Sequence, residues 1–285
     1  MRIALVSYDD SPPQGGQGVV VRDMRAALLA SGVDVVTVSG RGDHAVAYPR
    51  RLGRPPLDFS LHLARHPELI TQLGADIVHL LGGPGGVLFT RRLSVPMVVT
   101  ANHTYRQAHR RSSPRRGLAL VEARTYRRAA RVMAVSASTA TAVAAMGIPR
   151  DRIEVLAPGV QIPELGSANV RDPQRLLFVG RLESEKGVLD AVAVMAELAA
   201  RTPGVHGRVV GRGRLKAVVA AACAASSGVE FVGAVSDQQL AAEYASAAVV
   251  LVPSAYEGLG LVALEAMAAG AAVCQSPCSA RPPAR

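Results

Sequence analysis

The chain has 285 residues, of which 49% are hydrophobic and 19% are charged. This composition excludes a mostly disordered chain, and the length suits one large domain or two of ordinary size. No segment approaches the run of about 20 apolar residues that a transmembrane helix needs, and the N-terminal apolar run is too short for a signal peptide. We therefore expect a cytoplasmic protein.

Cysteine content and net charge narrow the function classes. The three cysteines, Cys223, Cys274 and Cys278, cannot form a disulfide framework and lack the second ligand pair of a zinc site, so we expect them to be reduced and structural. Lys and Arg number 32 and Asp and Glu number 22, which gives a net charge of +10. This charge favours an anionic partner, such as nucleic acid, an acidic membrane surface or a phosphorylated small molecule.

Short β-branched runs alternate with longer runs of Ala, Leu and Arg in the first half of the chain, a pattern that predicts βα units and a parallel sheet. A helix is predicted at residues 19–30, where Ser31-Gly32 ends it. Strands are predicted at residues 3–7, 34–39, 77–81, 96–100, 131–135 and 153–156. These elements predict a Rossmann-like domain over residues 1–162.

A polar, turn-rich stretch follows Pro158-Gly159, and the alternation then restarts, which predicts a second Rossmann-like domain over residues 163–285. The predicted strands are 176–179, 207–210, 230–232, 249–252 and 271–274, and the predicted helices are 188–200, 215–225, 237–246 and 261–269. No helix is predicted after the last strand, so this domain is expected to be incomplete, with residues 276–285 loosely packed.

The first loop with potential chemistry is the glycine-rich turn that contains Gly15 and Gly16 and leads into a helix. Its glycines would let the backbone approach a phosphate at the positive end of that helix. The turn fits neither the dinucleotide-binding pattern nor the P-loop pattern. A purely structural turn is the alternative.

A second loop places two cations, Arg181 and Lys186, between a strand and a helix. The forked donors of Arg and the point charge of Lys together suit a diphosphate. The alternative is a solvated turn in which both cations pair with Glu183 and Glu185. The glycine turn at residues 211–213, after the next strand, is expected to be structural.

The segment from Pro253 to Met267 carries two carboxylates eight residues apart, Glu257 and Glu265. A helix that starts near Gly260 would leave Glu257 in the preceding loop and place Glu265 on its second turn. Because a carboxylate on an apolar helix face needs a partner, a ribose diol and a neighbouring Arg are the two candidates for Glu265.

Together these segments resemble the retaining, nucleotide-sugar-dependent glycosyltransferases of the GT-B fold, specifically the group-1 or GT4 family. The resemblance is strongest at Phe178-Val179-Gly180-Arg181 with Lys186-Gly187, and at the Glu257 to Glu265 spacing, which is similar to the family's E-x7-E signature. It implies an α/β fold of two Rossmann-like domains that face a cleft. It also implies sugar transfer from a nucleoside diphosphate sugar with retained anomeric configuration.

The resemblance further implies how the donor would be held. Arg181 and Lys186 would neutralise its diphosphate in place of a metal, so we expect no metal and no other cofactor. The Gly15-Gly16 turn would close over the diphosphate, and the amides near Gly260 and Leu261 would bind it at a helix N-terminus.

The remaining implied contacts concern the ribose, the sugar and the base. Glu265 would take the ribose hydroxyls, and Glu257 would hold the sugar near its anomeric carbon. His103, which stands one position away from the family's pattern, would face that sugar from the first domain. Val235 would offer backbone contacts to the base.

Two other functions stay open at this point. The elements that usually follow the last strand in this family do not occur, which would suit a truncated, inactive nucleotide-sugar-binding protein or pseudoenzyme. An epimerase or phosphorylase of the same fold is the other alternative, although it would make less use of the two glutamates.

Arginines are concentrated between residues 106 and 131, and the spacing predicts that Arg124, Arg127, Arg128 and Arg131 share one helix face. They predict peripheral contact with an anionic membrane at its inner face, as for a lipid-linked acceptor, or a phosphorylated acceptor. A solvated face is the alternative. We do not expect nucleic acid, because only Tyr105 and Tyr126 are available for stacking. The full set is Arg106, Arg110, Arg111, Arg115, Arg116, Arg124, Arg127, Arg128 and Arg131.

Overall fold

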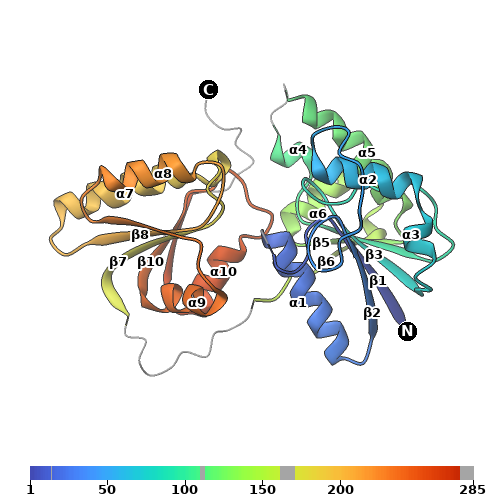
Figure 1. Cartoon of the computed structure of the whole chain (residues 1–285), viewed down its shortest axis with the longest axis horizontal. Coiled ribbons are helices and arrows are strands. Elements are labelled where there is room, and N and C mark those ends of the chain that lie inside the picture. The colour runs from blue at the N-terminus through green and yellow to red at the C-terminus, as the bar shows by residue number, and fades with distance from the viewer. Residues whose placement is uncertain (14, 110–112, 161–170, 277–285) are drawn as a thin grey trace. The chain divides into compact units, whose positions relative to one another are not determined.

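The computed structural model describes residues 1–13, 15–109, 113–160 and 171–276. The chain divides into two compact units, Met1–Pro158 and Gly159–Arg285, and each unit is built on one parallel sheet (Figure 1). The predicted domain boundary, between residues 162 and 163, lies outside the described residues.

Unit 1 is a doubly wound α/β unit whose six strands lie in the order β2-β1-β3-β4-β5-β6, with every neighbouring pair parallel. The strand order reverses between β1 and β3, which makes this pair the topological switch point. In chain order the unit contains β1 (Arg2–Ser7), α1 (Gly16–Ala30), β2 (Asp34–Ser39), α2 (Pro55–Arg65), α3 (Glu68–Thr71), β3 (Ile77–Gly82), β4 (Met97–Ala101), α4 (Tyr105–Ala108), the 3-10 helix η1 (Pro114–Gly117), α5 (Leu118–Arg128), β5 (Arg131–Ala134), α6 (Ala137–Ala144), the 3-10 helix η2 (Arg150–Arg152) and β6 (Ile153–Val155).

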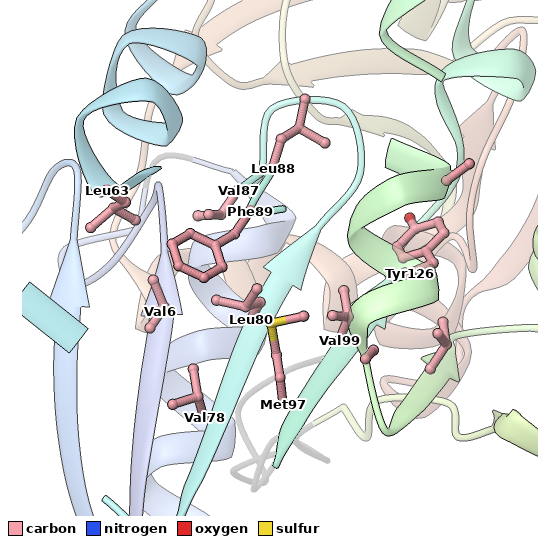
Figure 2. Packing of buried hydrophobic residues seen from close by; sticks show 14 of the residues in the cluster. Val6, Leu63, Val78, Leu80, Val87, Leu88, Phe89, Met97, Val99 and Tyr126 are labelled. Atoms are coloured by element: carbon pink, nitrogen blue, oxygen red, sulfur yellow. The ribbon is translucent and has the colours of Figure 1, made fainter. Parts of the chain in front are cut away.

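Both faces of this sheet are buried, as expected for parallel strands that read as continuous apolar runs. Alternate residues such as Val6, Leu80 and Val99 point to one face, where they pack with Leu63 of α2 and Tyr126 of α5 (Figure 2). On the other face Ile3, Leu5 and Val35 pack against α1. The period of two along each strand thus divides the core between the two helical layers.

Unit 2 repeats the architecture with five strands in the order β11-β10-β7-β8-β9, all parallel. Its switch point lies between β7 and β10. In chain order the unit contains β7 (Asp172–Val179), the 3-10 helix η3 (Ser184–Lys186), α7 (Val188–Arg201), β8 (His206–Val210), α8 (Lys216–Ala224), β9 (Val229–Gly233), α9 (Asp237–Ser246), β10 (Ala247–Val252), α10 (Leu261–Ala268) and β11 (Ala272–Gln275).

Helices cover both faces of this second sheet as well (Figure 1). One face packs against α7 and α8 through Phe178, Val209 and Met195. The other packs against α9 and α10 through Leu177 and Val250. Because unit 2 has five described strands where unit 1 has six, it is the smaller of the two sheets.

The elements predicted from sequence occur in the structure, but the start of α1 and the end of α5 differ from the prediction. Helix α1 starts at Gly16, three residues before the predicted start, so Gly15 is its N-cap residue. The prediction of one helix face for four arginines is wrong at its last member. Helix α5 ends at Arg128, Ala129 is extended, and Arg131 opens strand β5 and pairs with Glu154.

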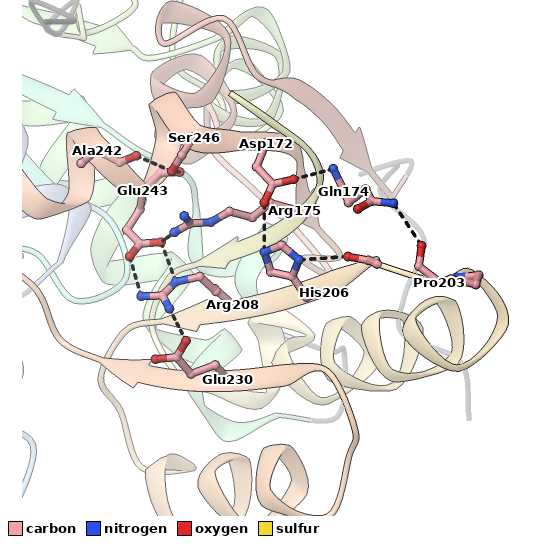
Figure 3. Close-up of polar contacts among 11 residues, drawn as sticks. Asp172, Gln174, Arg175, Pro203, His206, Arg208, Glu230, Ala242, Glu243 and Ser246 are labelled. Carbon is pink, nitrogen blue, oxygen red and sulfur yellow. Dashed lines mark hydrogen bonds and ion pairs between the residues drawn. The ribbon is translucent and has the colours of Figure 1, made fainter. Parts of the chain in front are cut away.

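A partly buried ion network connects α9 to the sheet of unit 2. The Glu243 carboxylate accepts hydrogen bonds from Arg208 of β8, over 2.9 Å, and from Arg175 of β7, while Arg208 also pairs with Glu230 (Figure 3). Burial opposes the charge on Glu243, but Arg208 and Arg175 outweigh it and lower the pKa of this carboxyl group. Removing one partner would leave a buried charge unpaired, so we assign this network to stability.

Within the described parts of the chain, no helix combines the length and the hydropathy required to cross a membrane.

Candidate functional site

The residues of interest in unit 2 follow β7 and β10, the two strands that form its switch point. In open α/β sheets, ligands bind beyond the carboxyl ends of the strands at this position. Arg181 and Lys186 lie in the segment after β7, and Glu257 lies in the segment after β10. The topology therefore brings together two loops that are about 70 residues apart in sequence.

These two loops are held together by their backbones. The Ala255 amide donates to the Glu185 carbonyl over 2.9 Å. Gly187 has a φ of +64°, and a Cβ at this position would lie 2.4 Å from the Pro253 carbonyl oxygen. Glycine is required here for both reasons, because other residues rarely adopt this φ and their Cβ would collide with the neighbouring loop.

The close approach of the loops places Lys186 against Glu257. The Nζ atom of Lys186 lies 2.6 Å from Oε1 of Glu257, with the two side chains 21% and 17% exposed. Arg181 is half exposed and lies 3.3 Å from Glu185. The alternative expected from sequence, in which both cations pair with Glu183 and Glu185, thus holds for Arg181 alone.

Glu183 has a different partner. It accepts hydrogen bonds from Arg214, whose guanidinium lies 2.6 Å away, and these bonds lower the pKa of the Glu183 carboxyl group. The turn that precedes Arg214 is tightly packed, because a Cβ on Gly211 would lie 1.9 Å from the Gly180 carbonyl oxygen. These contacts support the structural interpretation of the turn at residues 211–213.

The N-terminus of α10 lies at the same edge of the sheet. Gly260 is its N-cap residue with a φ of +82°, and no side chain caps the helix. The first amides with helical partners are those of Ala263 and Leu264, which both donate to the Gly260 carbonyl. In the described part of the chain the preceding amides, including that of Leu261, have no hydrogen bond, so this helix end can accept an anion.

Glu265 lies on the second turn of α10, as predicted, and is partly buried. Its Oε2 accepts a hydrogen bond over 2.7 Å from the hydroxyl of Tyr244 of α9. Burial and the neighbouring carboxylate raise the pKa of Tyr244 well above its ordinary value, so this phenol remains a donor. Tyr244 is therefore a partner of Glu265 that the sequence analysis did not consider. Val235, between β9 and α9, packs against the same core as α10.

In unit 1 the glycine turn follows β1 at the switch point of that sheet. Gly15 caps α1 without a side chain, and Gln17 donates to the Leu81 carbonyl at the end of β3 over 3.3 Å. Two buried carboxylates that sequence analysis missed precede the turn. Asp9 pairs with Arg41 over 2.6 Å and Asp10 with His44 over 2.7 Å.

His103 lies in the loop after β4, at the carboxyl edge of the same sheet. Gly83 has a φ of +90°, and a Cβ there would lie 2.6 Å from the carbonyl oxygen of His103. The loop after β3 therefore fixes the backbone of this histidine. The contact of His103 with a sugar stays a prediction.

Two residues beyond His103, the chain is anchored to a carboxyl group that sequence analysis also missed. Glu122 of α5 is fully buried and accepts hydrogen bonds from the Tyr105 amide and the Tyr126 hydroxyl, both over 3.0 Å. Burial raises the pKa of Glu122 to about 7. A carboxyl group amid the arginines of α5 resembles a surface residue in sequence, and only the tertiary packing reveals its burial.

Two further sequence predictions can be placed. Among the described residues, no group of three or more His, Cys, Asp or Glu side chains is arranged to hold a metal ion. Of the arginines between residues 106 and 131, Arg110 and Arg111 lie outside the described residues. Arg127 donates to the Met146 carbonyl over 3.1 Å, so it is anchored to the protein.

Comparison with known families gives two matches that together span most of the chain. The family described as Glycosyltransferase Family 4 matches residues 14–162, and the one described as Glycosyl transferases group 1 matches residues 173–284.

Curated relatives agree with these families. The chain is 30% identical to a D-inositol 3-phosphate glycosyltransferase of Arthrobacter sp. (strain FB24), over 95% of this chain and 78% of the relative. It is 28% identical to a glycogen synthase of Mycobacterium tuberculosis (strain ATCC 25618 / H37Rv), over 95% of this chain and 76% of the relative.

Solved structures show the same fold. WaaG, a glycosyltransferase involved in lipopolysaccharide biosynthesis, superposes with a TM-score of 0.73 at 20% identity, over 98% of this chain and 82% of WaaG. A sucrose-phosphate synthase from Thermosynechococcus elongatus gives a TM-score of 0.69 at 20% identity, over 97% and 81% of the two chains. The fold expected from sequence, two Rossmann-like domains of the GT-B type, is confirmed.

Proposed function

Because the chain belongs to the group 1, Family 4 glycosyltransferases, which use nucleotide-sugar donors, we propose that it transfers the donor's sugar with retention of anomeric configuration. One observation carries the assignment of the donor site. At the switch point of unit 2, a lysine, a carboxylate and an uncapped helix N-terminus converge on the edge where such sheets bind ligands.

The donor diphosphate is bound by cations and amides of unit 2. Lys186 and Arg181 supply the positive charge, and the amides of Gly260 and Leu261 supply hydrogen bonds at the positive end of α10. Both cations have carboxylate partners, Lys186 with its side chain 21% exposed and Arg181 with its side chain 48% exposed, so a diphosphate exchanges one anion for another. This charge makes a metal unnecessary, and we propose that none takes part.

The two glutamates bind the other parts of the donor, which are the sugar and the ribose. Glu257, beside Lys186, holds the sugar near its anomeric carbon, next to the diphosphate that Lys186 binds. Glu265 accepts hydrogen bonds from the ribose hydroxyls, and its bond from Tyr244 fixes the direction of the carboxylate. Backbone groups at Val235 contact the base.

Unit 1 contributes two elements to the proposal. The Gly15-Gly16 turn offers backbone amides at the N-terminus of α1 for the diphosphate, and His103 faces the transferred sugar. The proposed donor contacts of Lys186, Arg181 and Glu265 do not depend on either element, so unit 1 and unit 2 can be tested separately.

Retention follows if the new bond forms on the face from which the diphosphate leaves. The bond from the anomeric carbon to the diphosphate oxygen breaks, and a bond from that carbon to the acceptor oxygen forms. The acceptor's proton passes to the leaving diphosphate. Lys186, Arg181 and the α10 amides stabilise the charge that develops on this leaving group, which is the effect expected of preorganised donors.

The acceptor is proposed to carry a phosphate or a lipid-linked phosphate, in keeping with the net charge of +10. Three relatives are named D-inositol 3-phosphate glycosyltransferases, which gives a phosphorylated acceptor a precedent. The alternative of a binding protein without turnover has no such support, because the relatives reported above are named as transferases and synthases.

A donor screen followed by product analysis tests the proposal. Thermal-shift measurements with UDP, GDP, ADP and dTDP sugars identify the donor, because a ligand stabilises the fold according to its affinity. Isotope-labelled donor then reports transfer or hydrolysis, and proton NMR of the product gives its anomeric configuration. We expect stabilisation by one donor and a product of unchanged configuration. An inverted product would overturn retention, and the absence of stabilisation by every donor would overturn the site.

A further inference from the structure

A hollow lined by arginines lies at the amino-terminal ends of strands β4 and β5 in unit 1, whereas His103 lies beyond the carboxyl end of β4. It has a volume of about 370 Å³ and is formed where the chain enters β4 and β5. His103 follows the carboxyl end of β4, whereas Pro96 and Met97, which line the hollow, lie at its start. The hollow is therefore separate from the carboxyl edge of this sheet, where His103 and the Gly15-Gly16 turn are proposed to contact the donor.

Five arginines from three segments converge on this hollow. Arg91 and Arg92 come from the segment before β4, Arg127 and Arg128 from the last turn of α5, and Arg152 from η2. No acidic residue occurs among the described residues that line it. Five like charges around one hollow repel each other, so an anion that enters gains from all of them.

Contacts to backbone carbonyls position three of these arginines. Arg91 donates to the Ala64 carbonyl over 3.0 Å, Arg127 to the Met146 carbonyl over 3.1 Å, and Arg152 to the Arg127 carbonyl over 3.5 Å. Carbonyl oxygens hold the side chains in place but leave their charge uncompensated. Each guanidinium also has five donors, so several N–H groups remain for a ligand.

The other two arginines are not engaged by the protein. Within the part of the chain that the structure describes, the side chains of Arg92 and Arg128 make no hydrogen bond or ion pair, and both residues are exposed. The tendency of arginines to contact the last carbonyls of a helix explains Arg152, which contacts the Arg127 carbonyl of α5. It does not explain the two guanidinium groups, of Arg92 and Arg128, that have no such contact among the described residues.

We propose that this hollow is a binding site for a phosphate-bearing anion, distinct from the donor site. Forked guanidinium groups match the geometry of phosphate oxygens, and several of them can contact a diphosphate or a cluster of phosphomonoesters at once. A free phosphate compound and the phosphate of a lipid headgroup share this chemistry. The proposal does not depend on the proposed function, because the hollow lies at the other edge of the sheet.

The test compares variants that remove the same charge in different places. All chains carry Arg181→Ala and Lys186→Ala, so the proposed donor site does not contribute to binding. Arg92→Gln with Arg128→Gln removes the two unengaged side chains of the hollow. Arg51→Gln with Arg54→Gln is the control, because these exposed side chains lie at the opposite end of α2 from Ala64.

Two probes distinguish the sources of the anion. Inorganic pyrophosphate is titrated by calorimetry, and vesicles that contain phosphatidylglycerol and phosphatidylcholine are used in co-sedimentation. We expect the hollow variant to bind one or both probes about tenfold more weakly, and the control variant to change less than about twofold. Loss with pyrophosphate assigns a free phosphate ligand, and loss with vesicles alone assigns a lipid headgroup.

Two further measurements check that the variants fold and that the forked guanidinium groups matter for binding. Thermal melting should show that the hollow variant folds like the parent, because the side chains of Arg92 and Arg128 make no hydrogen bond or ion pair within the described residues. Arg92→Lys with Arg128→Lys, which keeps the charge but loses the forked donors, should give an intermediate affinity for the probe that binds. Equal weakening in the hollow and control variants, or no binding of either probe to the parent, would overturn the proposal.

Discussion

The two units share a doubly wound topology, and each switch point leads into a helix without a side-chain cap, but the charged residues beside the two switch points differ. In unit 2 the loops after β7 and β10 carry Lys186 and an uncapped helix N-terminus, which attract an anion. In unit 1 the loop after β1 carries Asp9 and Asp10, which already have cationic or imidazole partners. Topology therefore decides where a ligand lies in each unit, and the residues at that edge decide which ligand it is.

Among the variants that test this difference between the units, Glu257→Gln in unit 2 is expected to have the largest effect. We expect turnover to fall about a hundredfold, a magnitude typical of losing one preorganised polar group, with nucleoside diphosphate affinity within about threefold of the parent. Steady-state kinetics and calorimetry measure the two quantities. Glu185→Gln, which removes the partner of Arg181, is the control and should retain most turnover. Loss of affinity with normal turnover would contradict the assigned role.

A comparable effect on stability is expected in unit 1 from Glu122. Its folded-state pKa of about 7 exceeds the ordinary value of 4.5, so the unfolded chain loses this proton first as the pH rises. The contribution of Glu122 to the free energy of unfolding is thus full below about pH 4.5 and falls by about 3 kcal/mol by pH 7 and above.

Glu122→Gln should remove this pH dependence. The buried His79, whose pKa is lowered to about 4, acts in the opposite direction but is common to both proteins. The difference between parent and variant, measured by urea unfolding from pH 4.5 to 8, therefore isolates Glu122. Glu197→Gln, at an exposed position, should leave the profile unchanged. Parallel profiles for the parent and Glu122→Gln would show that the carboxyl group titrates normally.

Lys186→Ala should have the next largest effect, about a thirtyfold loss of nucleoside diphosphate affinity, because one charge-assisted hydrogen bond is lost. Affinity for the corresponding nucleoside should not change, since the lysine faces the phosphates. Calorimetry with both ligands measures the contrast, and Arg201→Ala, an exposed cation at the far end of α7, is the control. Equal losses for nucleoside and diphosphate would contradict the role of Lys186.

The smallest effects are expected at Glu265 and its partner. Glu265→Ala should lower nucleotide affinity about tenfold, and Tyr244→Phe about threefold, because the second change removes only the group that orients the carboxylate. The double variant should resemble Glu265→Ala alone, since Tyr244 acts through Glu265. A fully additive double variant would show that Tyr244 acts on the nucleotide by another route.

The fold could be predicted from sequence because parallel strands are continuous apolar runs that end in glycine, as at Phe178-Val179-Gly180. The ends of helices were harder to predict. Arg131 continues the arginine spacing of α5, but the backbone becomes extended at Ala129, so Arg131 lies in strand β5. Local spacing alone cannot show where a helix stops when no glycine or proline marks the end.

The loops that form the site could be predicted from sequence, but the contacts between their side chains could not. The eight-residue spacing placed Glu257 and Glu265 correctly relative to α10, since helix geometry is local. The contacts of Lys186 with Glu257 and of Tyr244 with Glu265 join residues 71 and 21 positions apart, and only strand order brings them together. The burial of Glu122 likewise depends on packing between elements.

The most direct test of the central claim, that the switch point of unit 2 binds the donor diphosphate, is NMR of the backbone amides during titration with a nucleoside diphosphate. We predict that the largest shift changes occur at Lys186, Gly260 and Leu261 and that the matching nucleoside leaves these amides unchanged. Shift changes confined to unit 1, with none in these three amides, would contradict the claim.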